Sequence, residues 1–211
     1  MATTVFWDWN GTLCNDVQPA LDAVNEMLRR RGKEEIGLYL FRSCIDTPIE
    51  KFYAHFFDFS VDPMEKISPE YHALYKAYLP LDCLAPGAKE TLQLFSEKGI
   101  RQVVLSSSHK DTILPYLESN GILHYFDAVL AADNWLALPK HERAKKYCEE
   151  KGIDGKDAWF VGDLLHDRET AEYCGGHCLL LPTGHHNADT LMQAGDCFCP
   201  SFSEIKHRIL G

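Results

Sequence analysis

The chain has 211 residues, of which 45% are hydrophobic, so it can bury one sizeable core and form one or two domains. Its formal net charge of -10 argues against a nucleic acid as partner, because binding a polyanion relies on clustered Lys and Arg. No apolar stretch approaches the ~18 residues that span a membrane, and no leader-like segment begins the chain. We therefore expect a cytoplasmic protein that does not bind membranes. We further expect a monomer or homodimer.

The first predicted element is a buried strand that ends on a carboxylate. The apolar run 5–7 leads into Asp8, and a turn at Asn10 and Gly11 follows. In open α/β sheets, ligands bind beyond the carboxyl ends of the strands. We therefore expect Asp8 to lie in a functional site.

Helical periodicity dominates the next part of the chain. An amphipathic helix is predicted over 19–31, with Asn15 or Asp16 as its cap, and the apolar residues of 34–79 keep helical spacing without an alternating strand pattern. This helical segment separates the first strand from the remaining α/β pattern. We therefore predict an α/β core domain over 1–15 and 83–211 with a helical cap domain inserted over 16–82.

Strands and helices alternate from residue 85 onward. This alternation predicts an α/β fold with a Rossmann-like, doubly wound parallel sheet and right-handed crossovers. The expected strands cover 100–105, 126–130, 158–161 and 178–181, and the expected helices cover 88–98, 110–119, 141–150, a segment ending at Cys174 and a short segment from about Asn187.

Polar residues follow several of these strands, and the parallel arrangement brings the carboxyl ends of the strands to one edge. They are Asp8 with Asn10, Ser106 with Ser107, Lys140, and Asp163 with Asp167. A carboxylate pair from two strands suits Mg²⁺, which prefers oxygen ligands and keeps waters for a substrate phosphate. Asp8 is then placed to attack phosphorus as a carboxylate nucleophile, while Ser106 and backbone amides near Gly11 hold the phosphoryl oxygens and Lys140 supplies fixed positive charge.

These motifs resemble those of the haloacid dehalogenase-like hydrolase superfamily. Its four motifs are met in order by DWNGT (8–12), VVLS (103–106), Lys140 and GDLLHD (162–167). The position of the helical insertion resembles the C1 cap of phosphoglycolate phosphatase-like and β-phosphoglucomutase-like members. The resemblance covers essentially the whole chain.

The resemblance implies a role for each motif residue. Asp8 is the expected nucleophile and a metal ligand, the backbone carbonyl of Asn10 and the side chain of Asp163 are further ligands, and Asp167 orients the metal waters. Ser106, Ser107, Gly11 and Lys140 are the expected phosphate-binding groups. The implied activity is a Mg²⁺-dependent phosphatase that hydrolyses a small phosphorylated metabolite through an aspartyl-phosphate on Asp8.

One position departs from the family pattern. The second Asp of the first motif, which protonates the leaving group and activates water, is Asn10 in this chain. An amide cannot transfer a proton, and a positioned general acid or base contributes typically ~10²–10⁴-fold to the rate. Either another group, such as His109 or a cap residue, replaces it, or Asn10 merely caps the turn and turnover is impaired.

Two alternatives to a phosphatase stay open at this stage. One is a protein that binds a phosphorylated metabolite without efficient turnover, and the other is a phosphomutase, which the loss of the acid/base disfavours. In the cap, Arg42 is a candidate ligand for a distal anion of the substrate, and the aromatic residues of 52–59 are expected to form cap core. The loop histidines His185 and His186 are expected to be solvated.

Overall fold

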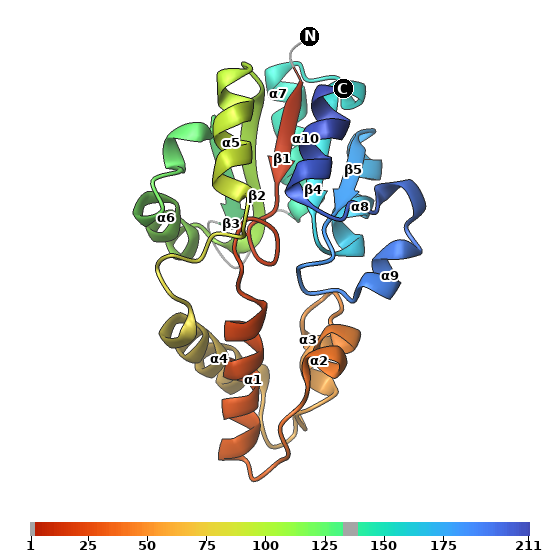
Figure 1. Cartoon of the computed structure of the whole chain (residues 1–211). Helices are drawn as coiled ribbons and strands as arrows, with labels where there is room; N and C mark the ends of the chain where they lie inside the picture. Colours follow the sequence, from red (N-terminus) through yellow and green to blue (C-terminus); the bar gives the residue numbers. More distant parts are fainter. Residues whose placement is uncertain (1–2, 133–138) are drawn as a thin grey trace.

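The computed structural model of the chain describes residues 3–132 and 139–211. Its centre is a five-stranded sheet with the order β3-β2-β1-β4-β5, in which every neighbouring pair is parallel (Figure 1). This confirms the predicted α/β class with a parallel sheet. The strands are β1 (Thr4–Trp7), β2 (Arg101–His109), β3 (Ala128–Ala132), β4 (Ala158–Gly162) and β5 (His177–Leu180).

Helices cover both faces of this sheet, which explains why the strands are apolar on both sides. Phe6 belongs to one buried cluster together with residues of α7 and α8, whereas its neighbours Val5 and Trp7 belong to the cluster on the opposite face with residues of α5, α6 and α10. The helices are α5 (Ala88–Glu97), α6 (Lys110–Ser119), α7 (Lys140–Lys151), α8 (Leu165–Cys174), α9 (Ala188–Met192) and α10 (Phe202–Leu210).

A second group of helices lies beyond the carboxyl ends of the strands, at the bottom of Figure 1. These helices are α1 (Val17–Arg30), α2 (Leu38–Cys44), α3 (Glu50–Ala54) and α4 (Met64–Tyr78). The chain passes between this helical group and the sheet twice, and the two passages pair with each other: Asn15 N donates to Cys83 O at 2.7 Å. The proposed division into a core and a cap at these passages stays a prediction.

The helices differ from the sequence-based expectation at α1 and α10. Helix α1 begins at Val17 rather than at residue 19, and α4 begins at Met64, so that Pro69 lies inside it. The first turn of α4 is held by buried Ile67, whose amide donates to Pro63 O at 3.1 Å. Helix α10 was not predicted; it packs on the sheet through Phe202, whose ring stacks on Trp7.

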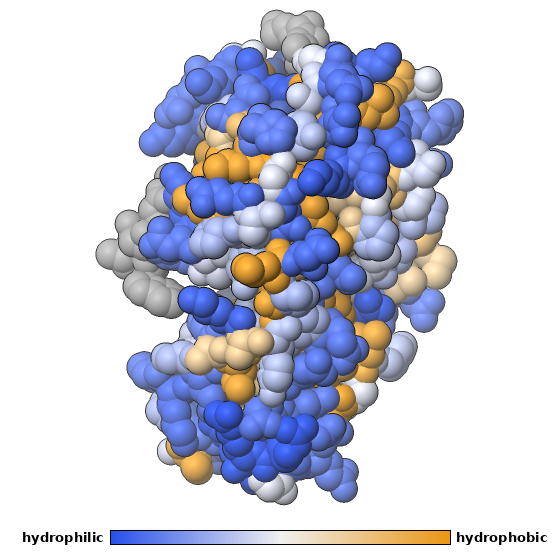
Figure 2. Space-filling view, turned by 60° about the vertical axis from the view of Figure 1, so that its left-hand side comes forward, coloured by the Kyte–Doolittle hydropathy of each residue, from blue (hydrophilic) through white to orange (hydrophobic). Residues whose placement is uncertain are grey.

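One face of the molecule is mainly hydrophilic (Figure 2). On the face shown in Figure 2, hydrophilic residues predominate, and apolar side chains appear as small separate patches. Within the ranges that the structure describes, none of the helices has the length and apolar character needed to cross a membrane.

Candidate active site

Three carboxylates meet at the carboxyl edge of the two central strands. Asp8 directly follows β1 and Asp163 directly follows β4, and the strands are joined there by a hydrogen bond from Asp8 N to Val161 O at 2.8 Å. Asp167 lies in the first turn of α8. All three side chains are buried, and they offer ligand oxygens within 4.8 Å of one another.

Lys140 inserts its ammonium group between two of these carboxylates. As the first residue of α7 it is buried, and its Nζ donates to Asp8 Oδ1 and to Asp167 Oδ1, each at 2.6 Å. Burial by itself lowers the pKa of Lys140, but the charges of Asp167 and Asp8 outweigh it and raise the pKa above its ordinary value. Lys140 therefore stays charged at any physiological pH.

Burial and the neighbouring carboxylates of Asp163 and Asp167 disfavour the ionised form of Asp8. Burial raises the pKa of Asp8 from 3.8 to about 8, even though Lys140 opposes the shift. An oxygen-only donor set of three carboxylates is the environment that Mg²⁺ prefers. The residues present therefore fit a divalent cation between Asp8 and Asp163, with Asp167 close beside it.

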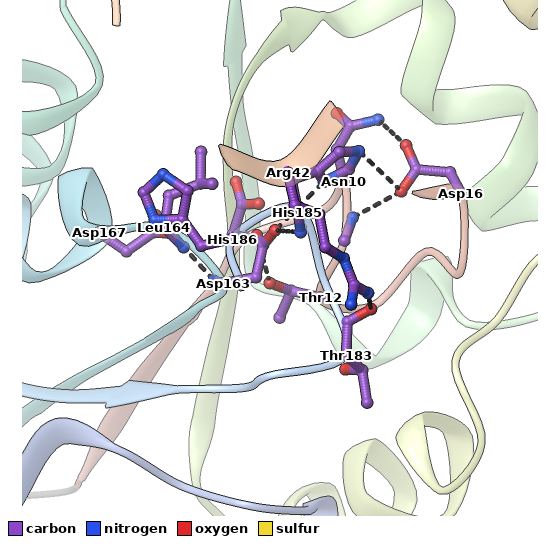
Figure 3. A network of polar contacts seen from close by, with 12 residues as sticks. Asn10, Thr12, Asp16, Arg42, Asp163, Leu164, Asp167, Thr183, His185 and His186 are labelled. Atoms are coloured by element: carbon purple, nitrogen blue, oxygen red, sulfur yellow. Dashed lines mark hydrogen bonds and ion pairs between the residues drawn. The ribbon is translucent and has the colours of Figure 1, made fainter. Parts of the chain in front are cut away.

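The side chain of Asn10 is hydrogen-bonded through both of its polar atoms. Its Nδ2 donates to Asp16 Oδ2 at 2.7 Å, as Figure 3 shows. The same Nδ2 donates to Tyr75 Oη at 2.9 Å, while Oδ1 accepts a hydrogen bond from Ser108 Oγ at 2.6 Å. The side chain therefore does not simply cap the turn. It links the first loop to the end of β2 and to α4.

The turn at Gly11 differs from expectation. Its amide, expected to hold a phosphoryl oxygen, donates in this structure to Asp16 Oδ1 at 2.6 Å. Gly11 has φ +71°, and a Cβ there would lie 2.2 Å from Asp163 Oδ2. Glycine is therefore required both by the backbone conformation and by the close approach of Asp163.

His185 is a site residue that the sequence analysis missed. The expectation of a solvated histidine is wrong, because its side chain is only 12% exposed and its Nδ1 lies 3.1 Å from Asp163 Oδ2. Its backbone amide also donates to Asp163 Oδ2, at 2.6 Å (Figure 3). Burial lowers its pKa, but the charges of Asp16 and Asp163 prevail and raise it to about 9. The signal that could have identified His185 is its position in the loop after a parallel strand, the same signal that identified Asp8.

The remaining predicted residues lie around this centre. Ser106 is buried at the carboxyl half of β2, where the pairing of Trp7 with Val104 brings β2 beside β1, whereas Ser107 is exposed. Arg42 on α2 donates from Nη2 to Thr183 O at 2.9 Å, in the loop that carries His185. The roles of Ser106, Ser107 and Arg42 stay predictions.

His109 forms the N-cap of α6, and its role as an acid/base stays a prediction. It ends β2, its side chain is 41% exposed, and its Nδ1 accepts a hydrogen bond from Asp111 N at the start of α6. A helix-capping role accounts for this position.

Comparisons with known proteins agree with this arrangement. The profile of the haloacid dehalogenase-like hydrolase family matches residues 5–180. A phosphoglycolate phosphatase from Nitrosospira multiformis is 29% identical over 95% of this chain and 92% of its own, and one from Pseudomonas fluorescens is 26% identical over 87% of this chain and 70% of its own.

Solved structures share the fold. A haloacid dehalogenase-like family hydrolase from Streptococcus pneumoniae superimposes with a TM-score of 0.84 over 98% of both chains at 19% identity. A predicted phosphoglycolate phosphatase from Haemophilus somnus gives 0.78 over 100% of this chain and 98% of its own at 22% identity. Because the family profile covers most of its length, the chain belongs to the haloacid dehalogenase-like hydrolase family.

Proposed function

We propose that this protein is a Mg²⁺-dependent phosphatase that hydrolyses a small phosphorylated metabolite through an aspartyl-phosphate on Asp8. The observation that carries the proposal is the convergence of Asp8, Asp163 and Asp167 with Lys140 in one buried cluster. The cluster combines a nucleophile, a cation site and a fixed positive charge, which are the parts that phosphoryl transfer needs.

The cation would be held by the side chains of Asp8 and Asp163, with the carbonyl of Asn10 as a further ligand and Asp167 supporting its waters. Bound there, Mg²⁺ would neutralise charge on the phosphoryl oxygens. Thr12 holds one ligand in place, because its Oγ1 donates to Asp163 Oδ1 at 3.2 Å.

In the proposed reaction, Asp8 acts as the nucleophile and Lys140 balances charge. Lys140 bonds to Asp8 Oδ1, which leaves Oδ2 to attack phosphorus. The new bond joins Asp8 to phosphorus while the bond to the leaving oxygen breaks, and water then attacks phosphorus to release phosphate and restore the carboxylate. The ammonium of Lys140 balances negative charge that develops on the phosphoryl group.

The substrate proposal comes from the relatives and from Arg42. Several relatives are phosphoglycolate phosphatases by name, which makes 2-phosphoglycolate the first compound to test. Within the described ranges 3–132 and 139–211, no group accepts a hydrogen bond from the buried Arg42 Nε, so it offers a donor for a carboxylate or other distal anion.

The test is phosphate release by the purified protein from 2-phosphoglycolate, sugar phosphates, p-nitrophenyl phosphate and acetyl phosphate, with Mg²⁺ or with EDTA. We expect Mg²⁺-dependent release that falls by at least about 10³-fold in Asp8→Asn. The matched control is Asp22→Asn, which removes an exposed carboxylate on α1 and is expected to keep full activity. Release that survives Asp8→Asn, or none from any compound, would contradict the proposal.

A second candidate is a protein that binds a phosphorylated metabolite and turns it over slowly. The observation that favours it is Asn10, whose amide cannot transfer a proton and is held by Asp16 and Tyr75. Such a protein would release phosphate from acetyl phosphate and p-nitrophenyl phosphate, whose leaving groups need little protonation, far faster than from alkyl esters. Calorimetric binding of an alkyl phosphate without release would support this candidate.

A further inference from the structure

Asp16 occupies a helix-capping position without capping the helix. It directly precedes α1, and its side chain makes no hydrogen bond to the first turn, although a cap is worth about 1 kcal/mol. The carboxylate is 1% exposed and turns toward the catalytic loop instead. There Oδ1 accepts from Gly11 N at 2.6 Å and Oδ2 from Asn10 Nδ2 at 2.7 Å.

Tyr75 on α4 completes the same network from the other side. Its hydroxyl donates to Asp16 Oδ2 at 2.6 Å and accepts from Asn10 Nδ2 at 2.9 Å. With Ser108 donating to Asn10 Oδ1, both hydrogens of the amide and the hydroxyl hydrogen of Tyr75 are used. The directions of the hydrogen bonds among residues 10, 16 and 75 therefore depend on an amide at residue 10 and a carboxylate at residue 16.

On the basis of the proposed function, we propose that Asp16 and Tyr75 are positioning residues that hold the catalytic loop. Asn10, Asp16 and Tyr75 form one hydrogen-bonded unit, and residue 10 is an amide because the carboxylate of this unit lies at residue 16. Asp16 and Tyr75 belong to the helical group, whereas Asn10 and Gly11 belong to the loop that carries Asp8. Docking of the helices on the sheet is thereby tied to the placement of Asp8. This arrangement gives a structural reason for the departure of residue 10 from the family motif.

Replacing Asn10 by the Asp of the family motif is therefore expected to destabilise the loop rather than to improve catalysis. Asn10→Asp alone places two carboxylates about 2.7 Å apart, where they cannot both ionise without repulsion. Asp16→Asn alone places two amides opposite each other and leaves donors unpaired. In the exchange variant Asn10→Asp/Asp16→Asn, the hydrogen bonds among residues 10, 16 and 75 can form again with donor and acceptor reversed, while Gly11 N and Ser108 Oγ keep donating to residues 16 and 10.

The first experiment is thermal unfolding of these three variants at pH 8 in the absence of substrate and metal. We expect each single substitution to lower Tm by about 5 °C or more and the exchange variant to return to within about 2 °C of the parent. Additive losses in the exchange variant would overturn the proposal. So would an Asn10→Asp variant that keeps the parental Tm and gains activity.

The second experiment separates positioning from stability. Tyr75→Phe removes only the hydroxyl, and we expect kcat to fall by about tenfold, measured well below Tm, with KM within about twofold of the parent. Tyr78→Phe removes an exposed hydroxyl from the same helix and serves as the control. A Tyr75→Phe enzyme with lowered Tm and parental kcat would show a structural role only and overturn the positioning role.

The two experiments also distinguish this proposal from the proposed function. If the parent protein releases no phosphate from any compound, the proposed function fails, while the unfolding measurements still decide whether residues 10 and 16 form one unit. If the parent is active and the losses are additive, only the positioning proposal fails.

Discussion

At the scale of single residues, the loops around Asp163 approach so closely that side chains are excluded. A Cβ at Gly11 would lie 2.2 Å from Asp163 Oδ2, and one at Gly184 would lie 2.2 Å from the same oxygen. Real Cβ atoms essentially never approach other atoms within 3.0 Å. Both glycines therefore allow the loops to close on the carboxylate that is proposed to hold the metal.

This crowding leads to a prediction for Gly11→Ala. The methyl group displaces Asp163, so we expect kcat to fall by about 10²-fold together with a lower Tm. The control is Gly32→Ala, because Gly32 has a similar φ of +64°, while a Cβ there would meet no described heavy atom within 4 Å apart from its chain neighbours. That variant carries the backbone strain, about 1–2 kcal/mol, without the clash, and should keep its kcat. Equal activities of the two variants in a phosphate-release assay would rule out the close approach.

At the scale of elements, one arginine joins the helices of the lower group. Arg31 directly follows α1, and its guanidinium bonds to both oxygens of Asp62 at 2.9 and 3.1 Å and to Glu70 on α4 at 2.8 Å. It also lies 5.0 Å from the ring centroid of Phe57. The end of α1, the segment after α3 and α4 are thereby held together by one bidentate ion pair and its neighbours.

This ion pair predicts a dependence of stability on acid pH. The hydrogen bond from Arg31, helped by Lys66, lowers the pKa of Asp62 from 3.8 to about 2. A carboxylate with a lowered pKa stabilises the fold above pH 4, and this contribution is lost as the pH falls toward 2. We therefore expect Asp62→Asn to have a lower Tm than the parent at pH 6 and the two to converge near pH 2.

The control for this experiment is Glu35→Gln, which removes a partner of Arg29 in an exposed pair. Exposed ion pairs contribute little, so its Tm should follow that of the parent over the whole pH range. A difference between Asp62→Asn and the parent that stays constant from pH 6 to pH 2 would argue against the assignment.

At the scale of the whole molecule, the helical group meets the sheet at two separate places. One is the unit formed by Asn10, Asp16 and Tyr75, and the other is the contact of α2 with the loop after β5. In the second contact, Asn187 Nδ2 donates to Ser43 Oγ at 2.8 Å and to Tyr39 O at 3.3 Å. The proposed active site lies between these two contacts, which suits a cap that closes over a substrate.

Weakening the second contact should therefore affect closure rather than chemistry. For Asn187→Ala we expect kcat/KM to fall by about fivefold, because a hydrogen bond contributes about 1 kcal/mol, with a change in Tm below about 2 °C. Gln193→Ala, an exposed position just after α9, is the control. A variant with parental kcat/KM would show that this contact does not contribute to closure.

Much of this fold followed from the sequence, because apolar runs and helical periodicity are local properties. Asp8 and Asp163 could be assigned to one edge because each ends an apolar run and parallel strands share that edge. The same reasoning placed Lys140 beside them at the start of α7. The all-helical expectation for 34–79 was coarser, since it did not resolve the three helices or their ends.

Tertiary structure alone decided the rest. Periodicity shows which face of a strand is buried but does not say which strands are neighbours, so the place of β1 between β2 and β4 came only from the fold. The contacts of Asp16 with Tyr75 and of His185 with Asp163 join residues far apart in the chain, and no local pattern specifies such partners. Sequence thus determined which groups stand at the strand ends, whereas folding determined which of them meet, because a hydrogen bond depends on positions in space that distant segments set together.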